Sequence, residues 1–343
     1  MNKNRRANSV IFGFDFQINA AIILMLENLK ELDFLRLEGN HEDIKLKLND
    51  GKYILAQAKS VERAWEDFKN VRSNLKKALC TLPEGSQGID TKQLIFITNS
   101  HNPLKDNESR NLFITEQSHR DYNTLPLKAQ NLIKNYLKES NISLDLNKFM
   151  IQVFKFETDN LLERYKVVEK CVDDFITEIK LSTPRLTKRI LQIWQNNIFQ
   201  NSTQKDADIT LTKKDIVWPI IVLITETKSD IPLALCDTID ECLYQEITYN
   251  YVDFINNCKE NFSLFIKVIY DFKNYKYKGS MSEKCMDFIN NNWENYISIL
   301  NLDEINLFDY DVRTGLIKII LYNIITNRIN IDKVKRSLNI DDY

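Results

Sequence analysis

Three polar residues in the first fifth of the chain have types and a spacing that could perform chemistry: Asp43, Gln57 and Lys59. A carboxylate and an amide oxygen are hard ligands that suit Mg²⁺, an ion that keeps several of its waters. A bound metal lowers the pKa of a coordinated water and neutralises charge on a phosphate. A lysine two residues after Gln57 could orient the attacking water or hold the phosphoryl oxygens. The chemistry that fits is metal-assisted cleavage of a phosphodiester.

A β-hairpin has to bring these three residues together. Residues 44–48 and 53–58 read as two strands, and residues 49–51 between them read as a turn. The turn is Asn-Asp-Gly, in which glycine supplies the positive φ. If the loop has three residues, the numbers of paired residues sum to about 100, so Asp43 lies opposite Gln57 and Lys59 projects from the same face. A two-residue loop would move Asp43 to the opposite face, so the site depends on the register.

The alternative is a plain hairpin with solvated polar side chains, because an acid followed by Gln-x-Lys is common by chance. The surroundings of Gln57 and Lys59 favour a functional role, since the rest of the second run is apolar or small. Long polar side chains in such a strand need partners, or their burial costs free energy.

The order of motifs around this hairpin resembles the restriction-endonuclease-like, PD-(D/E)xK superfamily, in the variant where Gln replaces the acid before x-Lys. Four segments carry the resemblance: Gly13-Phe14-Asp15-Phe16-Gln17, Leu37-Glu38-Gly39, Glu42-Asp43-Ile44 and Gln57-Ala58-Lys59. Their order is similar to that of the double-stranded-DNA endonuclease domain of CBASS and Lamassu antiphage effectors. The clear part covers about residues 8–100, and a weaker similarity lies at Thr212–Pro219.

The resemblance implies a Mg²⁺- or Mn²⁺-dependent endodeoxyribonuclease. In that family the acid of the second strand and the Gln-x-Lys carry the metal site, which corresponds here to Asp43, Gln57 and Lys59. Asp43 and Gln57 would bind the metal, with the backbone carbonyl of Ala58 as a further ligand, and Lys59 would act on the water or the phosphate. Glu38 and Gln17 are accessory candidates.

The chain looks most like the Lamassu nuclease subunit, which implies an effector of a bacterial antiphage defence system. Such a nuclease is held inactive by an SMC-like ATPase until it is triggered. The expected partners are double-stranded DNA, the ATPase, an accessory subunit of the defence complex, and further copies of the chain in an active homo-oligomer. Two alternatives stay open: a catalytically idle nuclease-fold scaffold that binds a partner through its helical half, and an RNase on the same fold.

The charge balance limits how this chain could hold DNA. It has 46 basic and 48 acidic residues, a net charge of −2, so any affinity must come from a local patch. One candidate patch lies on the helix predicted at residues 65–79, where three cations fall three and four residues apart: Lys69, Arg72 and Lys76. A solvated basic face is the alternative. A second, weaker cluster is Arg185, Lys188 and Arg189.

Other kinds of site find little support. The six cysteines form no CxxC, and the three histidines do not favour a His-based nuclease or a Ser-His hydrolase. His41 lies near Asp43, and Glu27 is an alternative acid further along the first helix. Polar residues interrupt the apolar stretch at 11–29, and the chain begins without the apolar core of a signal peptide. We therefore expect a cytoplasmic protein without a membrane partner.

The pattern of the 343 residues predicts two domains. Residues 1–200 are expected to form an α/β, restriction-endonuclease-like nuclease domain, in which a mixed sheet has flanking helices. Strands are predicted at residues 34–37, 44–48, 53–58, 93–100 and 151–156, the last at the sheet edge, and residues 101–125 as loop. Helices are predicted at residues 14–29, 65–79, 127–139, 161–179 and 185–199. Residues 201–343 are expected to form an all-α regulatory or assembly domain, with helices at 215–225, 238–257, 262–272, 282–300 and 311–326.

Overall fold

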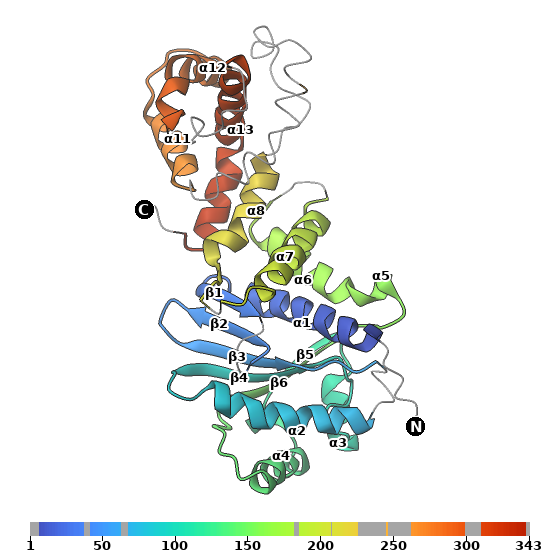
Figure 1. Ribbon diagram of the computed structural model, residues 1–343. Helices are drawn as coiled ribbons and strands as arrows, with labels where there is room; N and C mark the ends of the chain where they lie inside the picture. Colours follow the sequence, from blue (N-terminus) through green and yellow to red (C-terminus); the bar gives the residue numbers. More distant parts are fainter. Residues whose placement is uncertain are drawn as a thin grey trace. The chain divides into compact units, whose positions relative to one another are not determined.

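A computed structural model of the protein describes residues 7–37, 42–62, 68–181, 185–206, 208–225, 245, 262–298 and 310–340. The chain divides into two compact units (Figure 1). The first comprises Met1–Ile176 and Thr187–Lys213, and the second comprises Thr177–Leu186 and Lys214–Tyr343. The first unit is a mixed α/β fold, and the C-terminal region is mostly helical, as the sequence predicts.

A seven-stranded mixed sheet forms the centre of the first unit, in the order β5-β6-β4-β3-β2-β1-β7. The strands are β1 Leu32–Leu37, β2 Ile44–Leu48, β3 Tyr53–Ala58, β4 Thr91–Thr98, β5 Gln117–Asp121, β6 Phe149–Phe154 and β7 Leu211–Thr212. The strands β3, β4 and β6 are parallel to one another, and every other pairing is antiparallel. The carboxyl ends of β3, β4 and β6 therefore meet at one edge of the sheet.

Helices cover both faces of the sheet. Figure 1 shows α1 (Ala7–Asn28) on one side, and α2 (Phe68–Gly85) and α4 (Leu127–Glu139) on the other. The helix α2 is the crossover that a parallel β3–β4 connection requires. The core on the α2 side joins buried side chains of the sheet, of α2 and of α4: Leu55, Phe96, Ile151, Leu75, Leu79 and Ile133. The helices α6 (Lys166–Glu178) and α7 (Leu186–Ser202) complete the described part of this unit.

The first helix is long and apolar enough, by length and composition only, to cross a membrane over Asn8–Asn28. More than half of its most apolar stretch, 56%, is buried inside the structure. The reason is its packing on the sheet, where Phe16 stacks on Phe154 of β6 with ring centroids 4.8 Å apart. A core helix of this kind is apolar on most sides because the sheet and neighbouring helices surround it.

The structure differs from the sequence-based prediction in three places. The strand β5 falls in a stretch predicted as loop, and β7 falls in the region predicted to be all-α. Neither was predicted as a strand, because β5 is a polar edge strand and β7 has only two residues. The strand β6 was predicted at the sheet edge but lies between β4 and β5, with all six of its residues buried. The helix predicted at 161–179 is divided into α5 (Leu161–Arg164) and α6.

The described part of the second unit is helical. It contains α8 (Lys213–Thr225), α11 (Phe262–Asn274), α12 (Met281–Asn292) and α13 (Tyr310–Ser337), and α13 packs against α11 and α12. The helix α12 begins at a capping box of Ser280 and Glu283, and a 3₁₀ turn, Trp293–Tyr296, follows it. The helix predicted at residues 238–257 lies outside the described residues, apart from residue 245.

Candidate functional site

The β2–β3 hairpin adopts the register that the three-residue loop predicts. The strands pair Ile44 with Ala56 and Lys47 with Tyr53, so paired numbers sum to 100. The Leu48 N–H donates to the Lys52 carbonyl at 2.9 Å and closes the loop. Gly51 has φ +84°, the left-handed conformation that glycine adopts without strain. Because this register is fixed, residues 43, 57 and 59 share one face of the sheet.

Asp43 and Lys59 form an ion pair at the open end of this hairpin. The Asp43 N–H donates to the Ala56 carbonyl at 3.2 Å, which extends the ladder one residue beyond β2. Its Oδ2 accepts the Ala58 N–H at 2.8 Å, and lies 2.9 Å from Lys59 Nζ. Its Oδ1 lies 3.0 Å from the same ammonium. Asp43 is only 8% exposed, so the backbone and Lys59 hold this carboxylate in place.

Gln57 lies beside this pair and is 3% exposed. It aligns with Phe96 of β4, which in turn aligns with Ile151 of β6, and both belong to the core on the α2 side. Asp43, Gln57 and Lys59 therefore face the α2 side of the sheet. Lys59 continues the parallel ladder, since its N–H donates to the Ile97 carbonyl at 2.9 Å. The three residues stand at the carboxyl end of β3.

The accessory candidates take different positions. Gln17 is half-buried on α1, one helical turn after Gly13, and Ser60 Oγ lies 3.8 Å from where a Cβ on Gly13 would be. Gln17 thus comes from the helix that packs on the opposite side of the sheet (Figure 1). Glu38 and His41 lie outside the described residues.

The candidate acid Glu27 belongs to another part of the unit. It lies fourteen residues after Gly13, about 21 Å along α1. Its carboxylate is within hydrogen-bond distance of Gln117 and His119 of β5, at 2.9 Å each, and of Gln152 of β6, at 3.2 Å. Glu27 therefore joins α1 to the β5–β6 side of the sheet rather than to Asp43.

Asp15, in the first segment of the family resemblance, is a structural anchor. Its Oδ2 accepts hydrogen bonds from Arg164 at 3.2 Å and from the Tyr165 hydroxyl at 2.9 Å. Burial raises the pKa of the Asp15 carboxyl, although its hydrogen bonds oppose that effect. This contact ties the first half of α1 to the segment between α5 and α6.

The cations predicted on one face of α2 have different surroundings where the structure describes them. Lys76 pairs with Glu139 of α4 at 3.0 Å and lies over the Tyr136 ring, 5.7 Å from its centroid. Arg72 is exposed and lines a cavity instead. Lys69 lies in the first turn of α2, and its side chain is outside the description. Of the second basic cluster, Arg185 precedes α7 with φ +60°.

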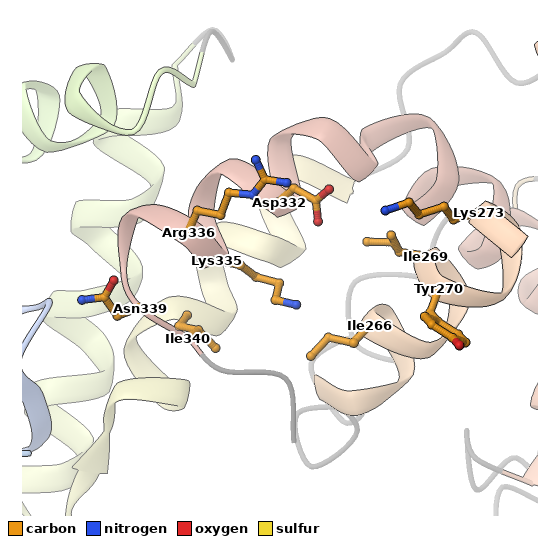
Figure 2. Close-up of a pocket in the computed structure, with 9 residues that line it drawn as sticks. All are labelled: Ile266, Ile269, Tyr270, Lys273, Asp332, Lys335, Arg336, Asn339 and Ile340. Atoms are coloured by element: carbon orange, nitrogen blue, oxygen red, sulfur yellow. The ribbon is translucent and has the colours of Figure 1, made fainter.

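Two cavities away from Asp43 were not predicted. One, of about 610 Å³, lies in the first unit and is lined by Arg72, Leu104, Lys105, Asp106, Asn107, Lys128, Ala129, Asn131, Leu132 and Asn135. The other, of about 490 Å³, lies in the second unit between α11 and the end of α13 (Figure 2). Spacing rules within one helix cannot find either, because the lining comes from separate segments.

The donors at the hairpin end fit a hard divalent cation. Mg²⁺ is commonly held by one or two carboxylates with waters completing its shell, and Asp43 with the Gln57 amide supplies that kind of donor. Among the described residues no group of three His, Cys, Asp or Glu side chains could hold a metal ion.

Comparisons with known proteins assign no family. No protein-family model matches the sequence, and no curated protein matches it. Among solved structures, the chain is similar to the Acinetobacter baumannii Cap4 SAVED/CARF-domain containing receptor with the cyclic trinucleotide 3′3′3′-cAAA. The identity is 11% and the TM-score is 0.39, with 62% of this chain and 45% of that chain covered. The match spans less than half of that receptor, and no function is transferred from so distant a likeness.

Proposed function

We propose that this protein is a metal-dependent DNA endonuclease with Mg²⁺ or Mn²⁺ as its cofactor. The observation that carries the proposal is the Asp43–Lys59 pair, with Lys59 Nζ 2.9 Å from the carboxylate, beside the buried Gln57. Burying a carboxylate, an amide and part of an ammonium at one strand end costs free energy unless they are paired. Pairing at the end of β3 therefore holds the Asp43 carboxylate and the Lys59 ammonium next to each other, with the Gln57 amide beside them.

Each residue then has a distinct task. Asp43 and Gln57 would hold the metal through their side-chain oxygens, with the Ala58 carbonyl as a further ligand. When bound, the metal supplies charge neutralisation at the phosphate and lowers the pKa of a coordinated water. The Lys59 side chain is 29% exposed, so its ammonium can contact a phosphoryl oxygen at the surface while the stem remains on β3. That contact stabilises charge developing in the transition state.

The biological setting is proposed from the family resemblance of the motifs. The protein would act in the bacterial cytoplasm as an antiphage effector of the Lamassu kind, held inactive by an SMC-like ATPase and an accessory subunit, and active as a homo-oligomer. The net charge of −2 agrees with a nuclease that has little affinity for DNA until it is triggered. The helical unit would then serve regulation or assembly.

The test is cleavage of plasmid DNA with Mg²⁺ by the wild type and by Lys59→Met. The expected loss is at least about a hundredfold, the usual effect of removing a group that stabilises transition-state charge. Lys47→Met is the matched control, because Lys47 lies on the same hairpin but pairs with Asp33 at 3.1 Å. Lys59→Met leaves the buried Asp43 carboxylate with the Ala58 N–H as its partner, so thermal unfolding of each variant checks that the fold is kept.

The assay includes the proteins encoded beside this one and a duplex RNA substrate. Cleavage of RNA but not DNA would replace the proposal with an RNase on the same fold. Equal loss in Lys59→Met and Lys47→Met would show that the Asp43–Lys59 pair is not special. No cleavage under any condition, with partners and trigger present, would favour an idle scaffold.

A further inference from the structure

A cationic cavity in the first unit is built from three separate segments: α2, the loop and short helix after β4, and α4. Its lining carries three cations and one carboxylate: Arg72, Lys105, Lys128 and Asp106. Three asparagines add amide groups to the same lining: Asn107, Asn131 and Asn135. A cavity with a net positive charge and several amide donors suits an anion that accepts hydrogen bonds.

Asp106 offsets one of the three positive charges, so the lining keeps a net positive charge. This aspartate begins the short helix α3 (Asn107–Arg110), accepting the Ser109 N–H at 3.0 Å and the Ser109 hydroxyl at 2.9 Å, and it contacts Lys128 at 3.1 Å. Burial raises the pKa of the Asp106 carboxyl, but Ser109 and Lys128 outweigh that effect, so its pKa lies below the ordinary value of 3.8 and the carboxylate is ionised at neutral pH. Arg72, by contrast, makes no hydrogen bond or ion pair within the described part of the chain.

The cavity shares one edge and one side of the sheet with Asp43, Gln57 and Lys59. Its loop follows the carboxyl end of β4, next to the carboxyl end of β3 that carries Lys59. Asn99, just after β4, is hydrogen-bonded to Val61, just after β3. Its Oδ1 accepts the Val61 N–H at 2.8 Å, and its Nδ2 donates to the Val61 carbonyl at 2.9 Å. The helices α2 and α4 that line the cavity cover the face on which Asp43 lies.

We infer that this cavity binds a backbone phosphate of duplex DNA and guides the duplex toward the Asp43 site. The inference rests on the proposed function and deepens it, because it names the surface that holds the substrate. Arginine can donate two parallel hydrogen bonds to a phosphate, and lysine adds a point charge. Backbone contacts of this kind position DNA without reading its sequence.

The experiment measures binding apart from cleavage, in protein that carries Lys59→Met. A fluorescently labelled DNA duplex is titrated at several NaCl concentrations, and binding is followed by anisotropy. In this background Arg72→Gln with Lys105→Gln is compared with Lys77→Gln and Lys170→Gln, which remove two exposed lysines that do not line the cavity. Thermal unfolding of each protein checks that the fold is kept.

The cavity variant is expected to bind the duplex at least about tenfold more weakly, with a salt slope smaller by about 1.8, the value for two lost phosphate contacts. The control should keep the parental affinity and slope. A cavity variant with unchanged affinity and slope would overturn the inference, as would a parental protein that binds no duplex at low salt even with the proteins encoded beside it and their trigger present.

The two proposals fail in different ways. If cleavage requires Lys59 but DNA binding is unchanged in the Arg72 and Lys105 variant, the proposed nuclease activity is supported and the proposed phosphate site in the cavity is wrong. If DNA binding requires Arg72 and Lys105 but the protein cleaves no DNA, the phosphate site is supported and the proposed nuclease activity is wrong.

Discussion

The two cavities described above, one in each unit, have similar charges and partly different walls. Each is lined by three cations and one carboxylate: Arg72, Lys105, Lys128 and Asp106 in the first unit, and Lys273, Lys335, Arg336 and Asp332 in the second. The first adds three asparagines, two leucines and an alanine, whereas the second adds one asparagine, three isoleucines and the exposed Tyr270. Figure 2 shows Lys273 on α11 facing α13, and Arg336 beside Asp332 on α13. Charge alone therefore does not distinguish them.

The position of each cation along its helix does distinguish them. Lys273 lies in the last turn of α11, and Lys335 and Arg336 lie in the last turn of α13, where the helix dipole favours positive charge. Helix stability explains these three without a ligand. Lys128 is the second residue of α4, where the helix dipole disfavours a cation, and its ion pair with Asp106 at 3.1 Å offsets that cost. Arg72 lies on α2 away from the carboxyl end of that helix, so the dipole does not favour its positive charge, and an anion in the cavity would.

The largest expected effect is a contrast between Arg72→Glu and Arg336→Glu, both in the Lys59→Met background. Reversing the charge at Arg72 should weaken duplex binding on the order of tenfold to a hundredfold, because a phosphate contact is lost and a repulsion is added. Arg336→Glu should leave binding unchanged and lower the free energy of unfolding by about 0.3–1 kcal/mol, through the end of α13. Anisotropy titrations and urea unfolding measure the two quantities.

If both substitutions weaken duplex binding equally, the two cavities do not differ in their role in DNA binding. Binding would then follow the overall charge of the chain, and the wall of asparagines would have no role. If Arg72→Glu binds DNA normally and Arg336→Glu binds it weakly, the DNA-binding site lies in the helical unit.

A smaller effect is expected from Asp106→Ala. The variant loses the N-cap of α3, a change that costs about 0.5–2 kcal/mol, and it should bind duplex DNA severalfold more tightly because the cavity loses its negative charge. The folded-state pKa of Asp106 lies below its ordinary value of 3.8, so its ionised form stabilises the fold above that pH. The stability difference from wild type should therefore hold from neutral pH to about pH 5 and shrink as the pH falls below 3.8. A difference that persists in acid would show that the charge contributes nothing.

The hairpin could be predicted from sequence because its determinants are local. Alternation over residues 44–48 and the Asn-Asp-Gly turn predicted the hairpin but left its loop at two or three residues. The structure has the three-residue register, which brings Asp43 to Lys59. The strands β5 and β7 could not be predicted, since β5 reads Gln-Ser-His-Arg-Asp and β7 spans two residues. Both exist because a neighbouring strand offers an open edge, and a single-segment pattern contains no information about that neighbour.

The same limit applies to the sites. The predicted trio of Asp43, Gln57 and Lys59 lies within one hairpin, whereas Arg72, Lys105 and Lys128 come from three segments that only the fold brings together. The sequence grouped Arg72 with Lys69 and Lys76 by helical spacing. That grouping could not include Glu139, which lies 63 residues after Lys76 and pairs with it.

The smallest effect is expected from Lys76→Gln, and it tests which cations of α2 hold DNA. The Lys76–Glu139 pair is half-exposed, so its loss should lower the free energy of unfolding by less than about 1 kcal/mol. Duplex binding should change less than about twofold, because Glu139 already matches the charge of Lys76. A double-mutant cycle with Glu139→Gln measures the coupling directly. If Lys76→Gln instead weakens duplex binding as much as Arg72→Gln does, the DNA binds along the face of α2. The loop that follows β4 and the helix α4 are then not part of the DNA-binding surface.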